Sequence, residues 1–214
     1  MSEISPGTHT PGVVDVDQVM KQNYNGLFKL LAGRILFAAV LIAAPIVLFR
    51  VGAPSTIFLV LPIVPGIFLL VLTAYRLWGG VRLVQCRKVL SHYPLQFHSR
   101  VVKKNSQWTE YGNVYEIKVS MRGEHGAPLM KAINAAGRRR WPQGAENGAW
   151  VAGDLVFGGV MVVPGSNAML FLNPADWDKL ASRREQADAE RIARAEQAGI
   201  SKRNWRKPIL FWGG

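Results

Sequence analysis

Few residues of this sequence combine the types and spacing that catalysis or metal binding requires. The chain has four histidines and a single cysteine. His92 and His98 are six positions apart with a proline between them, which matches no zinc-binding motif. Neither the nucleophile motif GxSxG nor the phosphate-binding motif GxxxxGK[ST] occurs. We therefore expect no catalytic residue, no metal and no cofactor.

Two other side chains with chemical potential have simple structural interpretations. Cys86 follows a long apolar region, where it would either accept a palmitoyl group or pack as a small apolar residue, and we favour packing. Asp154 lies among glycines and aromatic residues in the segment 150–160. That pattern fits either a ligand pocket or strand ends with bulges, and we favour strand ends.

Basic residues beside aromatic ones form two clusters suited to binding anions. The first ends at Trp141, and we favour a solvated loop there; as a binding site it would take lipid headgroups rather than free phosphate or nucleic acid. The second is the tail 199–214, whose composition is typical of an interfacial membrane anchor, with a partner-docking peptide as the alternative. The clusters contain Arg138, Arg139 and Arg140, and Lys202, Arg203, Trp205, Arg206, Lys207, Phe211 and Trp212.

A long apolar region must position these clusters. Between Ile35 and Tyr75 the only charged residue is Arg50. Residues 35–49 span about 22 Å as a helix, so this helix must extend into its flanks to cross a bilayer core of roughly 30 Å. The sequence predicts a transmembrane hairpin with helices at about 27–50 and 56–78 and a tight turn at 51–56.

The two apolar helices contain no ionisable side chain in their centres, which argues against an ion-coupled carrier. Pro62, Pro65 and Gly66 are expected to form a tolerated kink rather than a broken, substrate-binding helix. Ala39 and Ala43 are spaced for close helix packing. A cleaved signal peptide is the less favoured interpretation of the first helix, because a second apolar stretch follows it directly.

Basic residues flank the hairpin on one side. Arg50 alone lies in the connection, whereas the outer flanks hold Lys21, Lys29, Arg34, Arg76, Arg82, Arg87 and Lys88. The positive-inside rule therefore predicts a multi-pass protein of the plasma membrane with both termini in the cytoplasm. No Asp or Glu occurs between Asp17 and Glu110, which suits a surface beside anionic lipid.

After the hairpin, apolar and polar residues alternate with the period of β-strands. Leu95, Phe97 and Val101 are expected on one face of a first strand. The clearest strand is 115–122, with four apolar residues facing one way. Weaker strands are predicted at 129–135 and 149–153, and a hairpin with a Pro-Gly turn covers 160–172. The apolar face of the clearest strand comprises Tyr115, Ile117, Val119 and Met121.

Asn173 and Pro174 are typical of a helix start, and Gly199 of a helix end. The predicted fold is thus membrane α+β. A transmembrane hairpin precedes a small cytoplasmic antiparallel β barrel, pleckstrin-homology-like or SH3/OB-like, with a C-terminal helix. The expected parts are a flexible tail (1–25), the hairpin (26–78), a juxtamembrane helix and β domain (79–173), a helix (174–198) and the basic-aromatic tail (199–214).

Several segments resemble small integral membrane proteins of high-GC Gram-positive (actinobacterial) type, whose function is not established. These are CRKVLSHYP at 86–94, WVAGD at 150–154, FGGV at 157–160, VPGS at 163–166 and NPADW at 173–177. The resemblance implies location and architecture and carries over no catalytic residue.

We therefore expect a membrane-anchored, non-enzymatic adaptor or binding module. An accessory subunit of a membrane complex is the main alternative, and a membrane-tethered enzyme is a weaker one. The expected partners are lipids of an anionic leaflet, with other membrane proteins or further copies of the chain as additional candidates. Nucleic acid is not expected.

Overall fold

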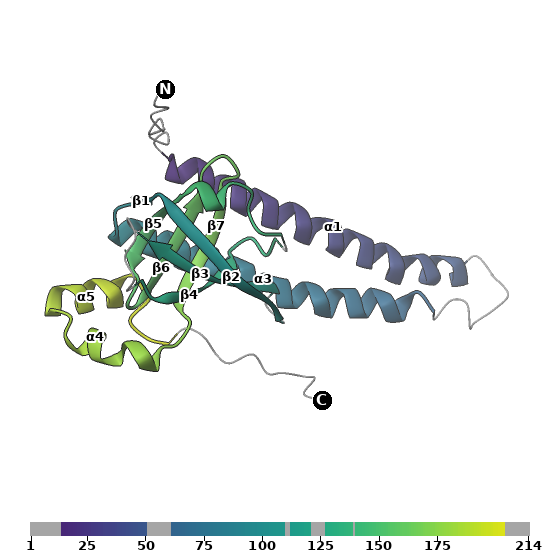
Figure 1. The fold of residues 1–214 in the computed structure, drawn as a ribbon. Coiled ribbons are helices and arrows are strands. Elements are labelled where there is room, and N and C mark those ends of the chain that lie inside the picture. The colour runs from purple at the N-terminus through teal and green to yellow at the C-terminus, as the bar shows by residue number, and fades with distance from the viewer. Residues whose placement is uncertain (1–13, 51–60, 110–111, 121–126, 139, 204–214) are drawn as a thin grey trace, which may run out of the picture.

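The computed structural model describes residues 14–50, 61–109, 112–120, 127–138 and 140–203. Two long helices lead into a seven-stranded sheet and a short helical C-terminal region (Figure 1). The helices are α1 (Val16–Arg50), α3 (Ile63–His92), α4 (Ala181–Glu185) and α5 (Ala189–Gln197), with 3-10 turns η1 (Ala145–Asn147) and η2 (Asp178–Leu180). The strands are β1 (Gln96–His98), β2 (Arg100–Thr109), β3 (Gly112–Ser120), β4 (Leu129–Asn134), β5 (Ala149–Asp154), β6 (Gly158–Val163) and β7 (Ala168–Pro174).

The helices α1 and α3 lie side by side and project together beyond the β domain (Figure 1). They approach closely at Gly66, where a Cβ would lie only 2.8 Å from Ile42 Cγ1. Ala38 is fully buried and its carbonyl oxygen lies at the same contact. Ala39 and Ala43 are exposed instead, so the small pair singled out in the sequence is not used between these two helices.

α1 begins earlier than the sequence predicts: residues 16–25, expected in a flexible tail, already belong to it. Pro62 is the N-cap of α3 and Pro65 lies in its first turn. A proline at these positions removes no hydrogen bond within α3. Residues 51–60 lie outside the described residues, so the kink expected at Pro62 and Pro65 stays a prediction. The predicted turn at 51–56 lies outside the described residues.

The sheet is entirely antiparallel, in the order β1-β5-β6-β7-β4-β3-β2. β1 and β2 are its two edge strands, yet only Ser99 separates them in sequence. The sheet therefore has to curl until its edges approach each other, which gives a half-barrel. The predicted antiparallel β domain is thus confirmed as a curled half-barrel sheet, whereas a β barrel of one of the named types stays a prediction.

The passage through Ser99 also reverses which residues face inward. His98 is buried opposite Ala149, and Val101 is buried opposite Val119. In one continuous strand, residues 98 and 101 would point to opposite faces, because they are an odd number of positions apart. The expectation that one face runs unbroken from Leu95 to Val101 was therefore wrong. The physical reason is that the chain leaves one edge of the sheet and joins the other at this point.

The sheet buries both of its faces in its central strands, because the inner face fills the half-barrel and helices cover the outer face. All residues of β6 and β7 are consequently buried. Burial of one Leu or Met side chain stabilises the fold by about 1.5–3 kcal/mol. The inner core includes Val101, Tyr115, Ile117, Val119, Met130, Met161, Leu170 and Leu172. The outer core includes Val19, Met20, Leu27, Leu83, Cys86, Val89, Val160, Val162, Met169, Phe171 and Ile200.

The clearest predicted strand is confirmed over its described part. Tyr115, Ile117 and Val119 are buried at 2 % exposure or less, and Lys118 is exposed. Met121 lies outside the described residues. The predicted strands at 129–135 and 149–153 and the hairpin at 160–172 correspond to β4, β5 and the β6–β7 pair.

The predicted C-terminal helix is broken into shorter pieces. Asn173 and Pro174 end β7, paired with β4, and do not cap a helix. The cap belongs to Asp188, whose Oδ1 accepts a hydrogen bond of 2.7 Å from Arg191 N at the start of α5. Gly199 follows α5, where Ile200 N donates to Ala195 O at 2.9 Å, so the predicted helix end is confirmed.

Candidate functional site

The two long helices divide into a base that belongs to the β domain and a free end that does not. At the base, Val19, Leu27 and Leu83 are at most 5 % exposed in the outer core. Among the described residues, the exposed large apolar side chains all lie between Phe28 and Phe49 or between Leu61 and Val84. By length and composition alone, both helices are able to cross a membrane.

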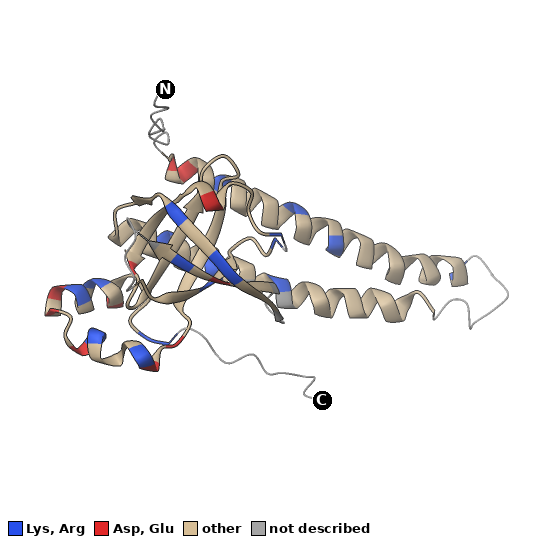
Figure 2. Ribbon diagram, in the orientation of Figure 1, with Lys and Arg blue, Asp and Glu red and all other residues tan. Residues whose placement is uncertain are grey.

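Most charged residues lie on the β domain, the helix bases and the C-terminal helical region. Figure 2 shows that the free ends are almost without charge, and that Lys and Arg lie along the base and over the sheet. Two of the predicted anion-binding residues, Arg138 and Arg140, are exposed in a loop at this boundary. Arg139 lies outside the described residues.

The first end of this loop is fixed by a buried asparagine. Asn134 is 2 % exposed, and its Oδ1 accepts hydrogen bonds from Ala136 N at 3.0 Å and Arg138 N at 3.2 Å. Its own carbonyl oxygen accepts from Gly137 N at 3.0 Å. A side chain that replaces backbone partners in this way sets the course of a tight turn.

The helices hold the same end of the loop. Arg76 Nη1 of α3 donates to Gly137 O at 2.6 Å. A Cβ at Gly26 of α1 would lie 3.6 Å from Arg138 Nη2, an ordinary contact distance, so this guanidinium lies beside the helix. Gly137 has φ +71°, a backbone conformation that favours glycine. A Cβ there would also lie only 3.0 Å from Arg76 Nη1, so a side chain would crowd this hydrogen bond.

The far end of the loop is fixed by Trp141. Its ring packs edge-on against Tyr115, with 4.9 Å between ring centroids. Its Nε1 donates to Glu146 Oε1 at 2.6 Å. Lys103 Nζ lies 5.4 Å from the Tyr115 centroid and 6.0 Å from that of Trp141, within cation–π range.

We call the residues Lys29, Arg34, Arg76, Arg138 and Arg140 the basic rim. Lys29 is one helical turn beyond Gly26 and exposed, and Arg34 follows on the same helix. Arg76 entered the sequence-based prediction only as a basic flank of the hairpin, and Gly26 and Asn134 did not enter it. The Asn-Ala-Ala-Gly run at 134–137 is the signal that would have found the turn.

The predicted binding residues of the tail do not belong to this loop, and most of them lie outside the described residues. Lys202 and Arg203 are exposed after α5, and Arg203 Nη1 lies 3.7 Å from Asp178 Oδ2. The remaining predicted tail residues fall within 204–214, outside the described residues. The structure therefore brings Arg138 beside α1, with Arg140 exposed further along the same loop, whereas Lys202 and Arg203 follow the C-terminal helical region.

Asp154 has a structural partner, as we favoured. Its Oδ2 accepts from Arg191 Nη2 at 2.7 Å and Nε at 3.0 Å, which ties α5 to the end of β5. Tyr93 lies nearby, where burial first and the Asp154 charge second raise the pKa of its phenol. Cys86 is fully buried in the outer core, so its sulfur packs as an apolar group and is closed to a palmitoyl chain.

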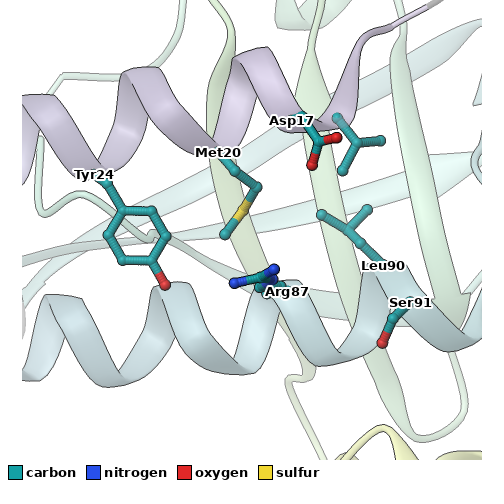
Figure 3. A pocket seen from close by; sticks show the side chains of 7 residues that line it. Asp17, Met20, Tyr24, Arg87, Leu90 and Ser91 are labelled. Carbon is teal, nitrogen blue, oxygen red and sulfur yellow. The ribbon is translucent and has the colours of Figure 1, made fainter.

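A shallow groove of about 360 Å³ lies between the first turns of α1 and the last turns of α3 (Figure 3). Met20 and Leu90 give it an apolar floor, and Asp17 and Arg87 place opposite charges along it. It lies at the opposite end of the helix bases from the free ends. Within the described part of the chain, no three His, Cys, Asp or Glu side chains gather as a metal site would need.

Comparison with known proteins gives no relative: no protein family, no curated protein and no solved structure matches this chain.

Proposed function

We propose that this chain is a membrane-anchored, non-enzymatic binding module or adaptor. Its free helix ends cross the plasma membrane as a hairpin, and its β domain lies at the cytoplasmic surface. The supporting observation is the distribution of apolar surface. Large apolar side chains such as Phe37, Phe49 and Phe68 are exposed by 59 %, 67 % and 62 %, and within the described residues all such side chains lie on α1, on α3 or at Leu61 just before α3. In water so large a patch would be unfavourable, whereas lipid covers it at no such cost.

The helix bases support an anchor that is retained. Cleavage after the first apolar helix, as in a signal peptide, would remove Val19, Met20 and Leu27 from the outer core. Each is at most 7 % exposed, so the β domain would lose part of the layer that covers β5, β6 and β7. The tail 199–214 keeps its predicted role as a second contact with lipid or a partner.

A subunit of a membrane complex is the second candidate. Gly33, Ala39 and Ala43 lie on the exposed side of α1, and a Cβ at Gly33 would have no atom within 4 Å. Small residues permit close packing of transmembrane helices, and these are left unused within the hairpin. The mass of the detergent-extracted protein separates the candidates, because an obligate subunit co-purifies with partners and an autonomous anchor does not.

The anchor is tested by placing charges on the free ends. Val40→Asp and Phe68→Asp together change positions that are 55 % and 62 % exposed. In a bilayer each Asp costs about 2.5–3.5 kcal/mol, so the variant should lose its resistance to extraction by alkaline carbonate. In water the same change would leave the behaviour of the protein unaltered or improve its solubility.

The matched control puts two Asp residues on the β domain, with Lys104→Asp and Gln107→Asp at exposed positions of β2. This variant should stay in the carbonate-resistant membrane fraction with the unaltered chain. Release of the unaltered chain by carbonate would contradict the anchor.

A further inference from the structure

We propose that the basic rim is a binding site for the phosphate group of an anionic lipid. This inference rests on the proposed membrane anchor and adds a ligand class and a defined place. The site comprises the guanidinium groups of Arg138 and Arg140, with Lys29, Arg34 and Arg76 on the two helices.

The loop that carries Arg138 and Arg140 is held at both ends before any ligand arrives. Asn134 fixes its first turn through two backbone N–H groups, and Trp141 fixes its end through Tyr115 and Glu146. Between these points, Arg138 and Arg140 are exposed. A loop with both ends fixed loses little conformational entropy when its arginines bind, which favours affinity.

The loop lies at a defined level along the two helices, next to the start of their apolar segments. Arg76 is the first charged residue after the apolar segment 51–75, and it donates to the loop at Gly137 O. On α1, Arg138 lies beside Gly26, and Lys29 and Arg34 follow before the uncharged stretch from Ile35. The loop is thus bonded to α3 at its first charged residue and lies beside α1 within its charged part. In a membrane this is the level of the lipid phosphates.

The side chains of the basic rim also match the chemistry of a phosphate group. Arg presents a planar fork of N–H donors that matches the oxygens of a phosphate, and basic pockets beside transmembrane helices on the cytoplasmic side bind such headgroups. The sequence has no acidic residue between Asp17 and Glu110, so no acid follows Asp17 on α1 or lies on α3 beside these cations. Glu146, the acid nearest the loop in sequence, accepts the hydrogen bond of Trp141. A phosphate carried by a lipid fits better than a free one, because the cations lie beside the apolar surface that holds the acyl chains.

The test uses the full chain in nanodiscs of mixed phosphatidylglycerol and phosphatidylcholine. Native mass spectrometry counts the lipids that stay bound after mild removal of the disc. We expect phosphatidylglycerol to be retained preferentially. Each cation near a membrane surface strengthens the attraction about fivefold, so Arg138→Gln with Arg140→Gln should weaken this preference about 25-fold. Both side chains are exposed, so the variant should keep the thermal midpoint of the unaltered protein.

The control removes the same charge at another level. Arg87→Gln with Lys88→Gln changes two exposed residues of α3 that lie about 16 Å further along the helix than Arg76. This exceeds the Debye length of about 8 Å, so lipid preference should stay within twofold of the unaltered protein. A millimolar concentration of soluble glycerol 1-phosphate should not displace the lipid, and displacement would show that free phosphate is the ligand.

The outcomes separate this site from the anchor. A chain that inserts into the discs but retains both lipids equally overturns the site and leaves the anchor standing. Equal losses in the rim variant and the control also overturn the site, because they indicate net charge alone. A chain that stays outside the discs overturns both proposals.

Discussion

Asn134 shows how one buried amide sets the geometry of a surface. Its oxygen orders the backbone of the loop, and the loop in turn carries Arg138 against Gly26. A basic run in sequence predicts an affinity for anions, but it does not tell where the charges lie. That information comes from a residue with no charge, because a buried acceptor must find donors and here the available donors are the backbone N–H groups of the turn.

Ile117 provides the test of the inner core at the same scale. It is fully buried in β3, opposite Met130 of β4, while its neighbour Lys118 is exposed. Ile117→Asp would bury an unpaired carboxylate, and we expect it to lower the free energy of unfolding by about 3–5 kcal/mol. Lys118→Asp should change it by less than about 0.5 kcal/mol. Thermal or denaturant unfolding of both variants in detergent measures this, and equal losses would mean that the register of β3 is wrong.

At the scale of elements, the alternation of apolar and polar residues predicted strands with one buried face. It did not predict strands buried on both faces or the place where β7 ends. β3 was recognisable because one face is buried and the other wet. β6 and β7 are buried on both faces, so they show no alternation, and only their Pro-Gly turn marked the hairpin. Asn173 was misassigned because the dipeptide Asn-Pro is a good helix start, yet pairing with β4 extends the strand through it. Tertiary pairing outweighed local preference there.

The helix pair shows the same limit. The sequence offered Ala39 and Ala43 as a packing pair, whereas the close contact is made by Gly66 and Ala38. Both sets consist of small residues, and which face turns inward is decided by how the helix bases lie on the sheet. Val19 and Leu27 at one end of α1 fix its rotation, and the rest of the helix follows. Such an influence from 11 or more positions away leaves no local signal.

The contact at Gly66 leads to a prediction about the hairpin. Gly66→Leu would bring a side chain onto Ile42 Cγ1 and the carbonyl oxygen of Ala38, where a Cβ alone would be 2.8 and 3.4 Å away. The helices must separate or shift, and overpacking of this kind costs about 1–3 kcal/mol. A lower thermal midpoint in detergent is the expected result. Gly33→Ala is the control, because a Cβ there meets no atom within 4 Å and alanine favours a helix by about 1 kcal/mol. No difference between the two variants would show that α1 and α3 are not packed at Gly66.

At the scale of the whole molecule, charge and apolar surface are separated along one direction. The free helix ends carry the exposed apolar side chains, and the helix bases and their loop carry the basic rim. Acidic residues lie beyond the rim, many of them in the C-terminal helical region and at the start of α1 (Figure 2). The chain has a net charge of +12, so the free ends stand out by their lack of charge. This order is what a protein needs if one end enters lipid and the next layer meets phosphate.

That order predicts which parts of the chain reach each side of the membrane. Cys86 is the only cysteine and is fully buried, so single cysteines introduced at other positions report their own accessibility. Ser182 is exposed on α4, and Thr10 precedes α1. Ser182→Cys and Thr10→Cys should both resist a membrane-impermeant maleimide in intact cells and react after the membrane is opened. Ser55→Cys, between the two apolar segments, should react in intact cells. Seven basic residues lie on the flanks and only Arg50 lies in the connection. The opposite orientation would therefore place most of the basic residues outside, against the positive-inside rule. Labelling of position 10 or 182 from outside would therefore reject the proposed topology, and labelling of only one of them would reject the hairpin.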